Sequence, residues 1–123
     1  MAAKKILFIE DERRLHELMS PVLRKAGYEV FDAYDGELGL EIFKEQKPDL
    51  VILDLILPKK DGFEILEKIR EDKELKDTSV AILTNLEEKF DIERAMAYGA
   101  RAYLVKANYG PEEILKKVNE ILN

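Results

Sequence analysis

The 123-residue sequence contains no cysteine, which excludes disulfide bonds and thiolate metal sites. It has no apolar stretch near the roughly 20 residues of a membrane-spanning helix. Charge returns as early as Glu10, so the first residues do not form the apolar core of a signal peptide. Positive charge is also in deficit, and a net charge of −6 argues against direct nucleic-acid binding, which requires a basic surface. These absences favour a cytoplasmic protein that contacts neither membranes nor nucleic acid directly.

The sequence does have a regular alternation of strand-like and helix-like segments, and 46% of its residues are hydrophobic. We expect strands near residues 5–10, 28–33, 49–54, 79–84 and 101–106. We expect helices near residues 12–26, 36–46, 63–73, 87–97 and 111–122. Strands that alternate with helices predict an α/β domain with a doubly wound parallel sheet covered on both faces. The length fits one domain, and we find no linker or repeat.

Local signals mark the ends of these helices. Gly27, Pro48 and Gly99 follow expected helix ends, and the Gly110-Pro111 pair precedes the last helix. Two pairs of residues have the spacing of a capping box. They are Asp61 with Glu64 and Asn85 with Glu88.

The first expected helix is amphipathic, with Leu15, Met19, Val22 and Ala26 at helical spacing. These four residues are expected to face the sheet. The only histidine, His16, is then expected to face solvent.

Polar residues stand where four apolar strands are expected to end. They are Glu10 and Asp11, Asp54, Thr84, and Lys106. In open parallel sheets, ligands bind beyond the carboxyl ends of the strands. Three carboxylates gathered there repel one another, and a hard divalent cation such as Mg²⁺ relieves the repulsion. Asp54 is then a candidate nucleophile for a phosphoryl group, with Lys106 and Thr84 stabilising the transferred charge.

Together these motifs resemble the receiver domain of response regulators, the phosphoacceptor module of two-component signalling. The motifs are Glu10-Asp11, the segment from Asp54 through Pro58 to Asp61-Gly62, Thr84, and Tyr103 three residues before Lys106. The resemblance covers essentially the whole chain and implies one receiver domain over residues 1–123, with no effector domain present. It also implies a three-layer (βα)5 flavodoxin-like fold with strand order 2-1-3-4-5.

The resemblance further implies how the site works. A histidine kinase or histidine phosphotransfer protein would donate the phosphoryl group to Asp54. Asp11 would bind Mg²⁺ directly, Glu10 would act through water, and the carbonyl of Ile56 would complete the protein ligands. Thr84 and Tyr103 would then move as switch residues and change the surface that a downstream protein target recognises. Such a domain is a signalling switch rather than a turnover enzyme.

The sequence departs from the family pattern at several positions. Ala107 follows Lys106 where the family usually has a proline joined by a cis bond, so the lysine could be aimed differently. Asn85 replaces a small residue, which could narrow access to the phosphoryl group. Ile56 and Leu86 are apolar at positions that tune hydrolysis in the family, and we therefore expect slow autodephosphorylation.

Three alternatives remain at this stage. The acids at the strand ends could simply cap the helices that follow. The chain could be a pseudo-receiver, an interaction module that phosphate does not switch, as Ala107 and Asn85 would suggest. It could also be a small flavin or nucleotide binder, although it lacks a glycine-rich phosphate loop after the first strand.

Overall fold

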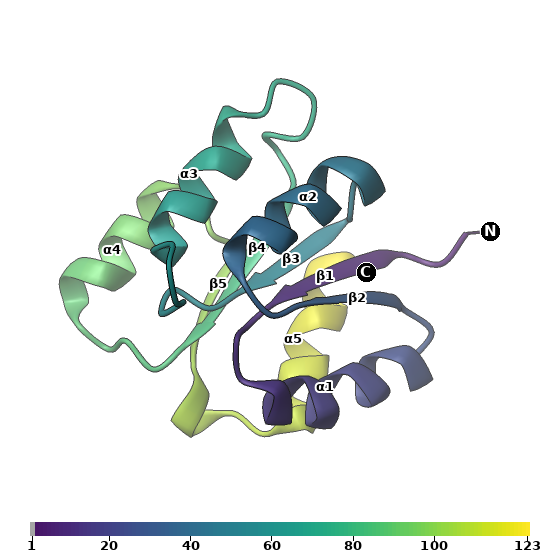
Figure 1. Cartoon of the computed structure of the whole chain (residues 1–123). Coiled ribbons are helices and arrows are strands. Elements are labelled where there is room, and N and C mark those ends of the chain that lie inside the picture. The colour runs from purple at the N-terminus through teal and green to yellow at the C-terminus, as the bar shows by residue number, and fades with distance from the viewer. Residues whose placement is uncertain (1) are drawn as a thin grey trace.

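A computed structural model describes residues 2–123, which form a parallel five-stranded sheet between two layers of helices (Figure 1). The strand order is β2-β1-β3-β4-β5, as expected for the flavodoxin-like fold. All four pairings are parallel, so the carboxyl ends of the strands lie along one edge. The strands are β1 (Lys5–Ile9), β2 (Glu29–Ala33), β3 (Leu50–Leu53), β4 (Ser79–Thr84) and β5 (Ala102–Val105).

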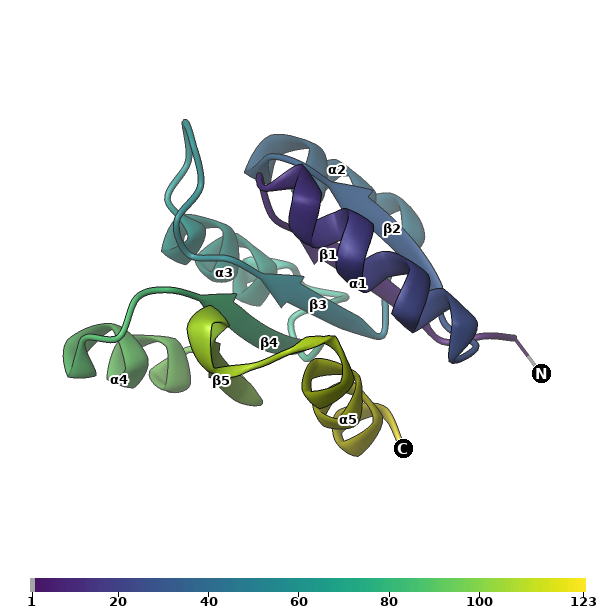
Figure 2. The same cartoon turned by 90° about the horizontal axis from the view of Figure 1, so that it is seen from below.

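The helices alternate with the strands and begin and end within two residues of the predicted limits. They are α1 (Arg13–Lys25), α2 (Gly36–Gln46), α3 (Gly62–Glu71), α4 (Lys89–Ala97) and α5 (Pro111–Leu122). A short 3-10 helix, Lys106–Asn108, follows β5. Helices α2, α3 and α4 cover one face of the sheet, and α1 and α5 cover the other. Figure 2 shows the molecule from the side of α1 and α5. Among residues 2–123, no helix is both long enough and apolar enough to cross a membrane.

Side-chain alternation along the central strands divides the core into two halves. In β1, Leu7 and Ile9 pack with α2 and α3, while Ile6 and Phe8 pack with α1 and α5. Both sets are fully buried or nearly so, as expected for a central strand of a parallel sheet. The sheet is therefore packed on both faces, and side chains at its carboxyl edge extend from a rigid backbone.

The buried face of α1 differs from the predicted one. The buried residues of this helix are His16, Met19, Ser20 and Leu23, whereas Leu15 and Val22 are only half-buried and Ala26 is exposed. His16, expected to face solvent, is only 2% exposed. The helix is thus rotated so that two polar residues face the sheet, because they meet a carboxylate on β2.

The cap signals are partly confirmed. The Asp61 carboxylate accepts a hydrogen bond from the amide of Phe63 at 2.9 Å and caps α3. Glu113 accepts one from the amide of Gly110 at 2.9 Å at the start of α5. Asn85 is not the cap of α4, because that helix begins only after Glu88. The prediction of a capping box at Asn85 is therefore wrong.

Candidate functional site: an acidic pocket at the carboxyl edge of the sheet

Three carboxylates meet where β1 and β3 end. Glu10, Asp11 and Asp54 each offer one oxygen, and these oxygens lie within 4.8 Å of one another. The pairing of β1 with β3 produces this meeting, because Ile9 is the register partner of Leu53 and the amide of Asp54 donates to the carbonyl of Ile9 at 3.0 Å. Glu10 is fully buried and Asp54 is 3% exposed, while Asp11 is exposed. The sheet thus holds two acids rigidly and presents the third to solvent.

Lys106, directly after β5, completes the pocket. Its Nζ donates to Oδ2 of Asp54 at 2.8 Å and lies 2.5 Å from Oε1 of Glu10, an ion pair without good hydrogen-bond alignment. The peptide bond to Ala107 is trans, as are the other peptide bonds of residues 2–123. The missing proline therefore does not turn Lys106 away from Asp54.

The surroundings change the proton affinity of two groups in this pocket. Burial raises the pKa of Glu10 to about 7, and the nearby charge of Asp54 adds to this, although the Lys106 ammonium and the hydrogen bond from the Glu12 amide oppose it. The pKa of Lys106 is raised despite the opposing effect of burial, because Asp54 and Glu10 both favour the ammonium form. The lysine is therefore a fixed positive charge among the acids.

The loop after β3 holds Asp54 in place. Its Oδ1 accepts a hydrogen bond from the amide of Ile56 at 3.0 Å, and the Leu55 carbonyl accepts one from the amide of Gly62 at 3.0 Å. The Ile56 side chain is 52% exposed beside the pocket. A cleft of about 380 Å³ opens here, with space for a small anionic group; it is lined by Asp11, Asp54, Ile56, Leu57, Pro58, Asn85 and Lys106.

The two expected switch residues form a second group, next to the pocket. Thr84 is fully buried at the end of β4, and its Oγ1 lies 3.5 Å from the amide of Leu86, a long hydrogen bond. The hydroxyl of Tyr103 donates to the carbonyl of Leu86 at 2.9 Å. Burial, with smaller contributions from Asp91 and Asp54, raises the pKa of Tyr103 to about 12, so the hydroxyl keeps its proton. Thr84 and Tyr103 thus meet at the same residue.

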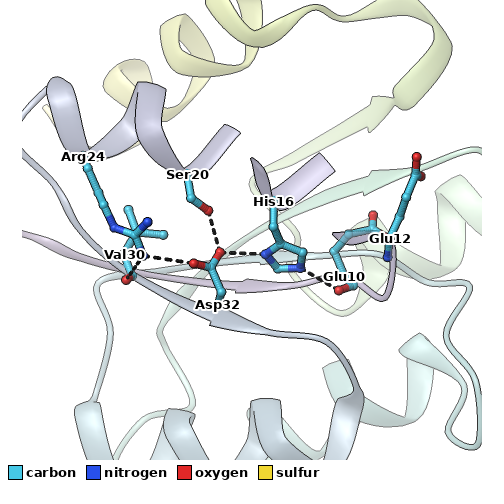
Figure 3. Close-up of polar contacts among 7 residues, drawn as sticks. All are labelled: Glu10, Glu12, His16, Ser20, Arg24, Val30 and Asp32. Atoms are coloured by element: carbon cyan, nitrogen blue, oxygen red, sulfur yellow. Dashed lines mark hydrogen bonds and ion pairs between the residues drawn. The ribbon is translucent and has the colours of Figure 1, made fainter. Parts of the chain in front are cut away.

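A polar network behind the pocket was missed by sequence reasoning (Figure 3). The ring of His16 lies between the Asp32 carboxylate and the Glu10 carbonyl, 2.6 Å from each. Asp32 also accepts from Ser20 at 2.5 Å and from Arg24 at 2.9 Å. Burial would raise the pKa of Asp32, but hydrogen bonds from His16, Ser20 and Arg24 outweigh it and lower the pKa to about 2. The sequence did contain a signal for this network. Asp32 lies within an expected strand, and His16 and Ser20 are four residues apart on an expected helix, so both can face the same strand.

With this geometry established, comparison with known proteins identifies the family. Residues 6–119 match the response regulator receiver domain, and the chain therefore belongs to that family. The fold and the acidic pocket are those of a signalling switch rather than of a true enzyme.

Individual relatives agree with this assignment. The alkaline phosphatase synthesis transcriptional regulatory protein PhoP of Bacillus subtilis is 37% identical over 119 residues, 97% of this chain and 48% of that protein. The chain thus spans about half the length of such curated relatives.

Solved structures give the same result at the level of the fold. The chemotaxis response regulator CheY4 of Vibrio cholerae superposes with a TM-score of 0.89 at 30% identity, covering 98% of this chain and 99% of that one. The BeF3-activated receiver domain of Klebsiella pneumoniae RstA has a TM-score of 0.86 at 28% identity, with 98% and 99% covered.

Proposed function

We propose that this receiver domain accepts a phosphoryl group on Asp54 from a histidine kinase or a histidine phosphotransfer protein in the cytoplasm. The observation that supports this most directly is the position of Asp54. It is buried at the edge of a cleft, within reach of two other carboxylates and in contact with the Lys106 ammonium. A core position or a simple helix cap would not bring these four groups together.

The donor set fits Mg²⁺. Hard divalent cations prefer carboxylate and carbonyl oxygens, and the pocket offers three carboxylates whose oxygens are near one another. Asp11 and Asp54 would bind the ion directly, Glu10 would act through water, and the carbonyl of Ile56 would be the remaining protein ligand. Bound there, Mg²⁺ supplies positive charge to the phosphoryl oxygens.

The chain's own residues account for the rest of the transfer. A carboxylate oxygen of Asp54 forms a bond to phosphorus as the phosphorus–nitrogen bond of the donor's phosphohistidine breaks, and the imidazole nitrogen keeps the electron pair. Lys106, already beside Asp54, neutralises charge on the transferred group, and Thr84 donates a hydrogen bond to it after turning from Leu86. This turn breaks one long hydrogen bond, the one that Thr84 accepts from the Leu86 amide.

The same movement connects the pocket to the surface. When Thr84 turns, the backbone of Leu86 loses its hydrogen bond to Thr84 and keeps the one from the Tyr103 hydroxyl. Tyr103 would then change position and alter the face around α4 and β5 that a downstream protein recognises. Direct contact with DNA or a membrane is not part of this proposal.

The test is intact-protein mass spectrometry after incubation with acetyl phosphate, with and without Mg²⁺. We expect one added phosphoryl group that depends on Mg²⁺, absent from Asp54→Asn. Asp77→Asn is the matched control, because it removes an exposed acid outside the pocket and should not change the reaction. Removal of the donor should then show slow loss of the added mass, since Ile56 and Leu86 cannot readily orient a water.

Two results would contradict the proposal. A folded protein that gains no phosphoryl group from acetyl phosphate or from any phosphorylated histidine kinase offered would be a pseudo-receiver. A gain that survives in Asp54→Asn would place the acceptor elsewhere. A phosphoryl lifetime of seconds would leave the acceptor intact but refute slow autodephosphorylation.

A further inference from the structure

His16 is a buried polar bridge between α1, β2 and the acidic pocket. Its ring packs between Phe8 and Tyr34, with centroid distances of 4.4 Å to each. Its two nitrogens are both used: Nδ1 is 2.6 Å from Oδ1 of Asp32, and Nε2 is 2.6 Å from the carbonyl oxygen of Glu10 (Figure 3). A histidine needed only for packing would not require both contacts.

The direction of these hydrogen bonds follows from the partners. The backbone carbonyl of Glu10 can only accept, so a hydrogen bond to it needs the proton on Nε2. The Asp32 carboxylate, which the Ser20 hydroxyl and the Arg24 guanidinium hold in place, lies against Nδ1. Asp32 therefore orients the ring so that its far nitrogen points at Glu10.

Glu10 is held by several contacts at once. Its amide donates to the carbonyl of Ala33 at 3.0 Å, and its Oε2 accepts from the amide of Glu12 at 3.0 Å. The contact from His16 fixes the remaining backbone group, the carbonyl that leads into Asp11. Loss of His16 would leave this carbonyl without that partner and would free the turn that carries both acids.

We propose that His16, oriented by Asp32, is a positioning residue that aims Glu10 and Asp11 at the metal site and thereby sets the affinity for Mg²⁺. This inference rests on the proposed function. Partners behind metal ligands commonly change metal affinity about 10- to 100-fold when they are removed. The network starts at β2 and α1, outside the pocket itself, so it extends the site to elements that hold none of the ligands.

The decisive variant is His16→Phe, which keeps an aromatic ring between Phe8 and Tyr34 but removes both hydrogen bonds. Asp32→Asn is the conservative partner variant, because its amide can still bond to Nδ1 and orient the ring. Two controls separate affinity from stability. Ser20→Ala removes one donor to Asp32 but leaves the His16 contacts, and Val118→Ala lowers stability from the buried face of α5.

Calorimetric titration with Mg²⁺ gives the first readout. We expect Kd to rise about tenfold in His16→Phe and to change less than about twofold in Asp32→Asn, Ser20→Ala and Val118→Ala. The second readout is the rate of phosphorylation by acetyl phosphate as Mg²⁺ is varied. The half-saturating Mg²⁺ concentration should rise in His16→Phe, while the rate at saturating Mg²⁺ should stay near that of the wild type.

The third readout needs no metal. In the metal-free protein, the Glu12 amide bonded to Glu10 should exchange with solvent several-fold faster in His16→Phe than in Val118→Ala, once each rate is compared with that variant's own free energy of unfolding. Unchanged Mg²⁺ affinity and unchanged exchange in a folded His16→Phe would overturn the inference. If the wild type itself bound no Mg²⁺, the proposed function would fail, and the exchange of Glu12 would still decide whether His16 holds the turn.

Discussion

At the scale of single residues, Asp32 shows how a partly buried acid is stabilised by its neighbours. Three donors on α1 surround its carboxylate, from His16, Ser20 and Arg24. They hold its pKa at about 2, below the ordinary value of 3.8, although burial acts in the opposite direction. The ionised form is therefore favoured in the folded state more than in the unfolded chain.

This shift predicts a loss of stability in acid. A lowered folded pKa gives stability that is complete above about pH 4 and is lost as the pH falls toward about 2. The free energy of unfolding of the wild type, measured by urea at several pH values, should fall relative to Asp32→Asn by about 2 kcal/mol across this range. The fall should be smaller in a Ser20→Ala background, which has one donor fewer. A difference that does not vary with pH would contradict this account.

At the scale of elements, the close approach of α3 to the loop after β3 depends on a glycine. A Cβ added at Gly62 would lie 2.3 Å from the Cα of Leu55 and 2.6 Å from the carbonyl oxygen of Asp54. These are backbone atoms, so they cannot move aside as the end of a flexible side chain would. The start of α3 and the position of Asp54 are thus linked sterically.

We expect Gly62→Ala to destabilise the protein by about 1–3 kcal/mol through overpacking and to slow phosphorylation by displacing Asp54. Gly110→Ala is the matched control, because its Cβ would meet only an Oε1 atom of Glu113 at an ordinary 3.6 Å. The free energy of unfolding from urea titration and the rate with acetyl phosphate measure the two effects. Equal results for both variants would show that the approach at Gly62 is not restrictive.

The elements themselves could be predicted from the sequence, but the buried face of α1 could not. Apolar periodicity correctly placed the helix, and it assigned Leu15 and Val22 to the sheet because only apolar residues enter that pattern. His16 and Ser20 are buried instead, because Asp32 from another element satisfies them. This contact joins α1 to β2, so the apolar periodicity of the helix alone does not reveal it.

At the scale of the whole molecule, the topology explains why the acidic pocket was predictable. Strand ends that are 44 residues apart, at Glu10 and Asp54, become neighbours because β1 pairs with β3 in parallel. The strand ends were visible as apolar runs that stop at polar residues. The hydrogen bond of Tyr103 to Leu86 was not visible, because it depends on how the loop after β4 folds back.

The same gathering of charge predicts that Mg²⁺ stabilises the entire fold. The carboxylates converge only in the folded chain, so the ion should bind that state and not the unfolded one. At ten times its Kd, Mg²⁺ should raise the free energy of unfolding by about 1.4 kcal/mol. Urea titrations with Mg²⁺, and with NaCl at equal ionic strength as control, measure this. Equal stabilisation by both salts would show that general screening suffices.

The close ion pairs of Lys106 with Glu10 and Asp54 have a consequence for the choice of cation. With the three carboxylates ionised, one ammonium leaves two negative charges, which a divalent ion balances and a monovalent ion does not. If the pocket binds a cation as proposed, the Lys106 ammonium would act as a fixed counterion that favours a divalent ion over a monovalent one. An arriving phosphoryl group would upset this neutrality again, and that renewed imbalance is a local driving force for rearrangement of the loops around it.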